Sequence, residues 1–377
     1  MWIWQQKNWP NFEFNSEALS EQLAQISFKQ GLLLGQSGHD HSQNQVLDNL
    51  LESMVQSSAI EGEAINPYSL RSSLATKLGV NNTQFTKDEN KVAQTKQSEA
   101  LAKLLFDAFE NYNEPLNEDR LLEWHQWLFT DHHSLVSQLA YVGQYRGDDV
   151  MQVVSGRVDR PIVHFQAPQK AQLNNEMSQF FEWFNETQTD KNKQTNKINP
   201  IIKAGLAHLY FLTLHPFEDG NGRLARLIID LSLAKAEHQS VRLYSMSNAI
   251  SLDRKQYYLI LEKTQKGDLD VTKYLMWFLE SLQKALDLAL NKIERTLKKA
   301  KFWSKTSEII MNAQQKKAIN RMLDGDFENG INSKQYQAIN KVSSATATRH
   351  LSDLVLKAVV GKSGAGGRSL RYLVKCL

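Results

Sequence analysis

HPFEDGNGRLAR, residues 215–226, decides how this sequence of 377 residues is interpreted. The stretch carries a histidine, two carboxylates, two glycines and two arginines between the apolar segments AGLAHLYFLTL and LIIDLSLAKA. Apolar residues recur at helical spacing in both flanking segments, so the sequence predicts two helices joined by a short polar loop. A loop of this composition between two apolar helices predicts a functional site.

The composition limits the class of protein. The formal net charge is +3, but residues 301–377 hold thirteen Lys and Arg against five Asp and Glu, which leaves −5 on residues 1–300. Cys376 is the only cysteine, so no internal disulfide is expected. The sequence shows neither a signal peptide nor an apolar run of the roughly 18 residues that a membrane span needs. We therefore expect a soluble cytoplasmic protein.

Most of the chain has the periodicity of helices. The clearest helical stretches are residues 46–62, 121–129, 177–184 and 271–300. Two β-branched runs within residues 150–165 predict a β-hairpin that turns at Ser155-Gly156-Arg157. The polar stretches 36–45, 79–90 and 185–199 are expected to be loops. The predicted fold class is thus mainly α with one β-hairpin.

From residue 331 the sequence predicts a different pattern of short elements. A short helix, a Ser/Thr-rich turn, a second helix, a glycine-rich tip and a closing strand follow in the order of a winged helix-turn-helix. We expect an N-terminal helical domain over residues 1–100, a central core over 101–295 and this winged-helix domain over 301–377. Such a domain contacts either DNA or another protein. The candidate DNA contacts are Ser344, Thr346, Thr348, Arg349, Lys357 and the basic wing 361–369.

Residues 219–226 have the composition of a phosphate site. Gly220 and Gly222 let the backbone approach a ligand closely, and a helix that begins there directs its N–H groups and the positive end of its dipole at an anion. Arg223 and Arg226 are three residues apart, so they share one helix face. Asp219 precedes the glycines and is a candidate Mg²⁺ ligand beside phosphate oxygens.

His215 is the group in this stretch that titrates near neutral pH, and it is placed to act as a general base toward a hydroxyl nucleophile. Each of these residues taken alone is more often structural. An anion site, a metal carboxylate, paired arginines and a base within twelve positions together favour transfer of a phosphorus centre.

The whole stretch resembles the signature of the Fic family, His-x-Phe-x-Asp/Glu-Gly-Asn-Gly-Arg-x-x-Arg, at every fixed position. The resemblance implies a helical core with a β-hairpin flap that transfers AMP from ATP to a Ser, Thr or Tyr hydroxyl of a target protein and releases pyrophosphate. It implies His215 as the catalytic base and Asp219 as the ligand of Mg²⁺. Phe217 would hold the loop by packing into the core.

The same resemblance implies a nucleotide-binding segment that runs from Gly220 to Arg226. Its members are Gly220, Asn221 and Gly222 as the anion hole, Arg223 on phosphate, Leu224 and Ala225 within the helix, and Arg226 on the γ-phosphate. Residues 150–165 would be the flap that covers the nucleotide and docks the target backbone as an added strand. Tyr257 is a candidate contact for adenine.

SSAIEG, residues 57–62, resembles the inhibitory pattern of the family, Ser/Thr-x-x-x-Glu-Gly/Asn. Ser57 and Glu61 are four residues apart and share one helix face. The resemblance implies that Glu61 pairs with Arg226 and denies that arginine to the γ-phosphate. Since the pattern lies N-terminal to the core, the sequence predicts autoinhibition within a single chain.

Three functions follow as alternatives. The first is a self-inhibited protein adenylyltransferase. The second is removal of AMP from a modified protein by the same site, with Glu61 positioning a water. The third is a DNA-binding transcriptional regulator.

The stretch WIWQQKNWPNFEFN near the N-terminus also resembles a domain that accompanies one large bacterial Fic group, so the resemblance covers roughly residues 1–300. A homodimer is expected from the family alone.

Overall fold

The computed structural model describes residues 1–37, 43–80, 93–131, 139–157, 159–186, 198–239, 243–363 and 370–375. The chain divides into two compact units, Met1–Asp287 and Leu288–Leu377, and each is described here by itself. Large parts of the three predicted loops, most of the predicted wing, and Cys376 lie outside the described residues. No helix in the described ranges combines the length and the apolar character needed to cross a bilayer.

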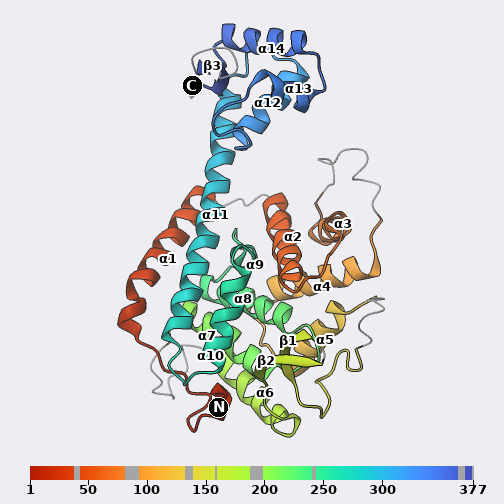
Figure 1. Cartoon of the computed structure of the whole chain (residues 1–377), viewed down its shortest axis with the longest axis vertical. Helices are drawn as coiled ribbons and strands as arrows, with labels where there is room; N and C mark the ends of the chain where they lie inside the picture. Colours follow the sequence, from red (N-terminus) through yellow and green to blue (C-terminus); the bar gives the residue numbers. More distant parts are fainter. Residues whose placement is uncertain are drawn as a thin grey trace. The chain divides into compact units, whose positions relative to one another are not determined.

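The first unit is mainly helical, as the sequence predicts (Figure 1). A short 3-10 turn, η1 (Ile3–Gln5), precedes its α-helices. These are α1 (Ser16–Ser37), α2 (Gln43–Ile60), α3 (Pro67–Leu78), α4 (Lys96–Glu110), α5 (Glu118–Leu128), α6 (Lys170–Asn185), α7 (Pro200–Leu214), α8 (Asn221–Glu237), α9 (Met246–Ser251), α10 (Arg254–Gln265) and the start of α11 (Thr272–Lys305).

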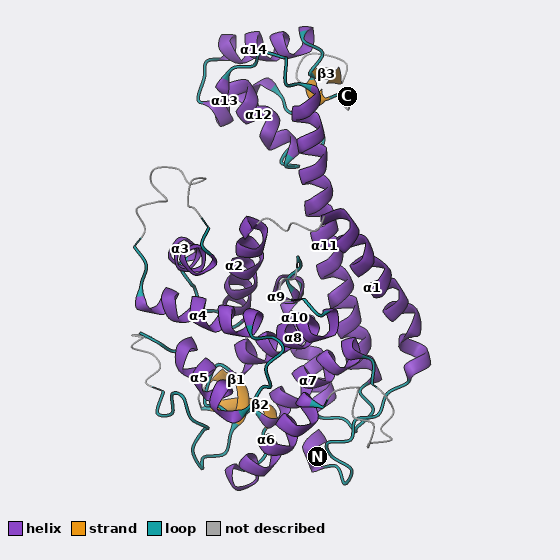
Figure 2. Cartoon of the chain, turned by 180° about the vertical axis from the view of Figure 1, so that it is seen from behind, coloured by secondary structure: helices purple, strands orange, loops and turns teal. Residues whose placement is uncertain are grey.

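Helices α7 and α8 form the buried centre of this unit and lie side by side in both views (Figure 1 and Figure 2). Nearly every residue of α7 is buried, which is the pattern of a helix that is apolar all round. Asn199 caps the start of α7 by accepting from the Ile201 N–H, and Pro200 takes the first position, where no helical N–H is needed. This helical hairpin fixes both ends of the 215–220 loop.

The predicted β-hairpin is present, as strands β1 (Gln152–Arg157) and β2 (Arg160–Gln166), but the predicted turn is wrong. Ser155, Gly156 and Arg157 belong to β1 and pair with residues 162, 161 and 160. Gly156 has φ of +89°, so the glycine bends the strand instead of making the turn. Because both faces are exposed at this end of the hairpin, the hydrophobic pattern does not determine where the chain reverses.

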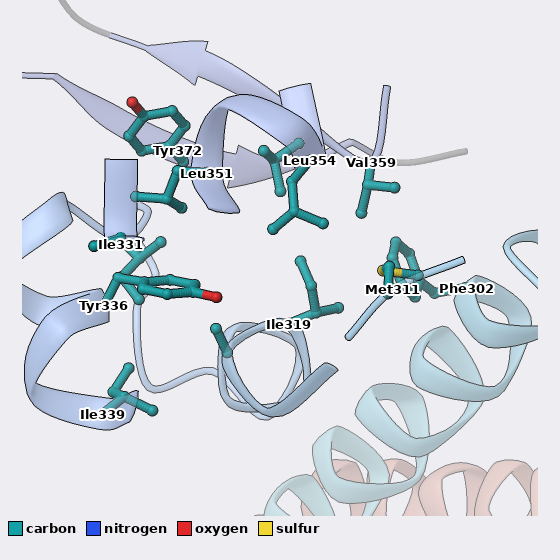
Figure 3. Packing of buried hydrophobic residues seen from close by; sticks show 13 residues of the cluster. Phe302, Met311, Ile319, Ile331, Tyr336, Ile339, Leu351, Leu354, Val359 and Tyr372 are labelled. Atoms are coloured by element: carbon teal, nitrogen blue, oxygen red, sulfur yellow. The ribbon is translucent and has the colours of Figure 1, made fainter. Parts of the chain in front are cut away.

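The second unit contains the end of α11, then α12 (Ala313–Leu323), α13 (Ser333–Asn340), α14 (Ser344–Leu356) and a small antiparallel sheet of β3 (Val360–Ser363) and β4 (Arg371–Val374). Its apolar core joins these elements, with Ile319, Tyr336, Leu351 and Tyr372 among the buried members (Figure 3). The assignment as a winged helix stays a prediction.

The candidate DNA contacts of the second unit differ in solvent exposure and in hydrogen bonding. Ser344, Thr348 and Arg349 are exposed on α14, whereas Thr346 is half-buried. Lys357 donates to Asp353 at 2.7 Å and to the carbonyl of Ile310 at 2.8 Å, so its ammonium group is held against the domain. DNA binding by this unit also stays a prediction.

Candidate active site

The loop between α7 and α8 is closed by the side chain of Asn221. Its Oδ1 accepts from the N–H of Phe217 at 3.0 Å, and its Nδ2 donates to the carbonyl of Phe217 at 2.8 Å. His215 ends α7 in the left-handed region with φ of +48°, and Gly220 precedes α8 with φ of +82°. The side chain of Asn221 therefore fixes the conformation of the loop through its bonds to Phe217. The backbone of the same segment can then face a ligand.

His125 of α5 packs against this loop. Its ring stacks on Phe217 with centroids 4.0 Å apart and planes 11° apart. Nδ1 accepts from the N–H of Gly143 at 2.9 Å, so the proton is on Nε2, which donates to the carbonyl of Asp219 at 3.2 Å. Burial lowers the pKa of His125 to about 4, so the ring keeps this neutral tautomer at neutral pH.

Arg146 holds the start of the loop. Its backbone N–H donates to the carbonyl of Pro216 at 2.9 Å, and its Nε donates to the carbonyl of His215 at 2.9 Å. A further bond at 2.5 Å joins its NH2 to the carbonyl of Pro168, which follows β2. This buried guanidinium thus connects the hairpin to the backbone of His215.

His215 is neutral and oriented at this position. Nδ1 lies 3.3 Å from the carbonyl of Leu212, and since a carbonyl only accepts, Nδ1 carries the proton. The lone pair of Nε2 is then available for a proton from a ligand. Burial, with the nearby charge of Arg146, lowers the pKa of His215 to about 4, so the imidazole is in its basic form at neutral pH.

A carboxylate occupies the N-terminus of α8. Oε1 of Glu61 lies so close to the α-carbon of Gly222 that a β-carbon added there would overlap it. The same oxygen lies 2.8 Å from NH2 of Arg226, and Oε2 accepts from the hydroxyl of Tyr258 at 3.1 Å. Burial opposes ionisation of Glu61, but the charge and hydrogen bonds of Arg226 prevail and lower its pKa. An anion of the protein itself therefore lies where helix N–H groups and a guanidinium converge.

Arg226 is almost fully buried and is held from three sides. Besides Glu61, it binds Ser57, with Nε donating to the hydroxyl at 2.9 Å and NH2 donating to the carbonyl at 2.8 Å. NH1 lies 3.5 Å from the hydroxyl of Tyr257. Ser57 and Glu61 of the predicted inhibitory pattern thus both contact this arginine.

Arg223 has a different environment. NH1 donates to Oε2 of Glu63, and the guanidinium lies over the ring of Phe129 at 4.8 Å from its centroid. Its Nε and NH2 are buried and have no hydrogen-bond partner among the described residues. A buried guanidinium with two nitrogens left over is suited to an anion that offers several oxygens.

The loop has two acidic residues: Glu218 accepts from the N–H of Ala140 at 3.0 Å, and Asp219, next to Gly220, is the candidate metal ligand. Its Oδ1 accepts from the N–H of Gly220 at 2.6 Å, Oδ2 lies 3.8 Å from NH2 of Arg223, and the side chain is 48% exposed. The described residues contain no cluster of three or more metal-binding side chains. One exposed carboxylate beside an anion site fits Mg²⁺, which is commonly held by one or two carboxylates together with substrate phosphates.

Tyr257, Leu224 and Ala225 lie in the interior. Tyr257 is 1% exposed, stacks on Trp277 with centroids 5.5 Å apart, and presents its hydroxyl to Arg226. The side chains of Leu224 and Ala225 are fully buried on the core side of α8. In this structure these three side chains are part of the core next to the site. A contact of Tyr257 with adenine stays a prediction.

The flap hairpin is tied to α10 by a chain of polar side chains. The Ser155 hydroxyl lies 2.6 Å from Nε2 of His164, and Nδ1 of His164 lies 2.8 Å from Oε2 of Glu262. Lys266 donates to the other oxygen of Glu262 at 2.5 Å. The hairpin is thus anchored both here and through Arg146.

The structure gives a role in the site to four residues to which the sequence assigned none: His125, Arg146, Glu63 and Tyr258. Arg146 stands in GQYR, which resembles the family's Gly-x-x-Arg element, so a signal for it was present. Glu63 follows the inhibitory pattern by two residues and carried no signal of its own. His125 was part of an amphipathic helix, where a histidine is more often structural.

Two family models match parts of the chain, and curated proteins and solved structures are similar to it. A family model described as Fic/DOC family matches residues 115–233, and a model of a domain of unknown function, DUF4172, matches residues 2–80. The chain is 32% identical over 114 residues to the protein adenylyltransferase Fic of Drosophila mojavensis, which covers 30% of this chain and 20% of that protein. It is 28% identical over 213 residues to the protein of the same name from Nematostella vectensis, covering 56% of this chain and 43% of the relative.

The matches thus span less than half the length of these curated relatives. The crystal structure of a Fic family protein from Desulfovibrio desulfuricans G20 has 18% sequence identity and a TM-score of 0.50, and the alignment covers 95% of this chain and 96% of that one. At this identity the likeness bears on the fold alone. The Fic/DOC model covers the loop between α7 and α8 together with His125, Arg146, Arg223 and Arg226, so the chain contains a Fic/DOC family domain over residues 115–233.

Proposed function

We propose that the protein is a self-inhibited protein adenylyltransferase that transfers AMP from ATP to a Ser, Thr or Tyr hydroxyl of a target protein. The observation that carries the proposal is the position of Glu61, whose carboxylate lies on the N-terminus of α8 against Gly222 and Arg226. A site that binds an anion of its own chain, beside a neutral histidine, is suited to phosphate and to base catalysis. The names of the curated relatives support the same reaction.

In the proposed reaction His215 is the catalytic base. Nε2 takes the proton from the target hydroxyl, and the hydroxyl oxygen attacks the α-phosphorus of ATP. The bond from the α-phosphorus to the oxygen that bridges to the β-phosphorus breaks, and pyrophosphate leaves with that oxygen. A phosphodiester then joins AMP to the target, while the proton remains on His215.

The phosphate charges are met by three groups on α8. The first-turn N–H groups at Asn221 and Gly222 have no partner within the helix and lie at the positive end of its dipole. Arg223 offers its two unbound nitrogens, and Arg226 becomes available when Glu61 leaves. Asp219 would hold Mg²⁺, which supplies charge neutralisation to the phosphate oxygens when bound.

Autoinhibition follows from the contacts of Arg226. While Glu61 binds this guanidinium, the γ-phosphate lacks its partner, and an added phosphate would meet the negative charge of Glu61 at close range. Ser57 keeps Arg226 in place through two hydrogen bonds. The flap strands would dock the target backbone by strand addition.

The test is transfer of label from ATP by a Glu61→Gly variant. With Mg²⁺ and ATP labelled at the α-phosphate, we expect at least about ten-fold more protein-bound label than for the wild type. The estimate takes the effect of Glu61 on ATP as a typical coupling free energy of about 1–3 kcal/mol. The double variant Glu61→Gly/His215→Ala should incorporate none.

ATP labelled at the γ-phosphate is the matched control, because AMP transfer leaves that label in pyrophosphate. Protein-bound γ-label would instead mean phosphoryl transfer and would overturn the proposal. Release of AMP from a pre-modified protein by the wild type, lost in Glu61→Gly, would favour the reverse reaction as the main one.

A further inference from the structure

The turn after α2 carries two carboxylates, and each binds one of the two arginines of residues 215–226. Glu61 binds Arg226, with 2.8 Å between Oε1 and NH2. Glu63, two residues later, accepts a hydrogen bond from NH1 of Arg223 through Oε2. The inhibitory pattern in the sequence includes the first of these carboxylates and leaves out the second.

Backbone bonds hold the two glutamates close together. The N–H groups of Glu61 and Glu63 both donate to the carbonyl of Ser58, each at 3.0 Å. Gly62 between them has φ of +83°, a conformation that favours glycine. The turn therefore presents both carboxylates as one preformed unit, which we call the 61–63 turn.

Arg223 is a binding group and not a solvated surface charge. Its side chain is 3% exposed, and only one of its nitrogens is satisfied by Glu63. Nε and NH2 remain buried without a hydrogen-bond partner in the described residues. A phosphate group with three oxygens can satisfy more of this guanidinium than a single carboxylate oxygen does.

We infer that Glu63 is a second inhibitory carboxylate, which occupies Arg223 as Glu61 occupies Arg226. The inference rests on the proposed function only for the identity of the ligand, a nucleoside triphosphate. The 61–63 turn then imitates two neighbouring phosphate groups, with two negative charges against two guanidinium groups. Full access of the triphosphate to the site requires that both carboxylates leave, so loss of one of them opens the site only in part.

This arrangement makes inhibition a competition for phosphate binding. A ligand with a triphosphate must displace the carboxylates, whereas a ligand without phosphate meets neither arginine. Removal of the Glu63 charge should therefore tighten the binding of ATP analogues and leave the binding of adenosine unchanged.

The experiment measures the dissociation constant of the full chain for α,β-methylene-ATP with Mg²⁺, and for adenosine, by titration calorimetry. The variants are Glu61→Gln, Glu63→Gln and the double variant. Glu110→Gln, at the exposed end of α4, is the charge-matched control. Thermal unfolding of each variant checks the fold, and Glu63→Ser serves as the second variant should Glu63→Gln unfold.

We expect each single variant to bind the triphosphate analogue about ten-fold more tightly than the wild type, within the usual range of coupling between sites. The double variant should bind more tightly than either, adenosine affinity should stay unchanged, and Glu110→Gln should behave as the wild type. Wild-type affinity of both Glu63 variants, alongside a gain in Glu61→Gln, would overturn the role of Glu63 alone. Absence of triphosphate binding in every variant would overturn the proposed function, and this inference with it.

Discussion

Arg226 is bound to Ser57 by two hydrogen bonds, one from Nε to the hydroxyl at 2.9 Å and one from NH2 to the carbonyl at 2.8 Å. The two residues are far apart in sequence, and both are buried. Helix α2, which ends one residue before Glu61, thus also positions the arginine that Glu61 binds.

Replacement of Ser57 by alanine should destabilise the protein by about 1–3 kcal/mol, because a buried charged donor then loses its acceptor. The measurement is chemical denaturation followed by circular dichroism. Ser58→Ala is the matched control, since the Ser58 hydroxyl is buried without a described partner and its removal should cost nothing. Equal losses in the two variants would contradict the assigned role of the Ser57 hydroxyl.

The pH dependence of AMP transfer should reflect the lowered pKa of His215. With a pKa of about 4, the base is neutral well below pH 7, and removal of Glu61 takes away a charge that favours protonation. For Glu61→Gly we therefore expect kcat/KM to stay flat between about pH 8 and about pH 6, and to fall only as the pH approaches the pKa of the free enzyme's base.

The lowered pKa of His215 also makes the stability of the protein depend on pH. An unfolded histidine takes up a proton near pH 6.5, whereas folded His215 does so near pH 4. His215 therefore lowers the free energy of unfolding progressively as the pH drops through this window. A decline of kcat/KM centred near the ordinary histidine pKa would contradict the buried, neutral base.

Asn221→Ala should open the loop between α7 and α8. Both backbone groups of buried Phe217 lose their partner, which should cost about 2–4 kcal/mol of unfolding free energy. AMP transfer by Glu61→Gly should fall as well, because the backbone donors next to Asn221 lose their arrangement. Asn175→Ala, at an exposed position of α6, should change neither quantity.

Glu262→Gln should loosen the flap with little effect on global stability. Hydrogen bonding by Lys266 and His164 lowers the pKa of Glu262, and burial opposes this only in part, so the carboxylate is charged at neutral pH. Exposed ion pairs contribute about 0–1 kcal/mol, so the melting temperature should barely move. Hydrogen exchange of the β1 and β2 amides should instead become faster, a change that Glu294→Gln in the second unit should not produce.

The local elements of this protein could be predicted from the sequence. Apolar periodicity predicted the helices on both sides of residues 215–226, and β-branched runs predicted the hairpin. The motif itself placed His215, Gly222, Arg223 and Arg226 at one loop and helix start, because residues so close along the chain share a site in any fold that makes that helix. The exact turn of the hairpin was wrong, since an exposed strand leaves its register open.

The partners of these residues were decided by the tertiary structure. His125 lies under Phe217, Arg146 binds the carbonyl of His215, and Glu63 reaches Arg223 across 160 positions of the chain. Such contacts depend on how separate helices pack, and packing is set by the combined shape of many side chains, which no short pattern encodes. The sequence alone thus determined the groups that can bind phosphate and accept a proton, whereas the packing of α2 and α5 against α8 and its preceding loop decided which of those groups are oriented, neutral or blocked.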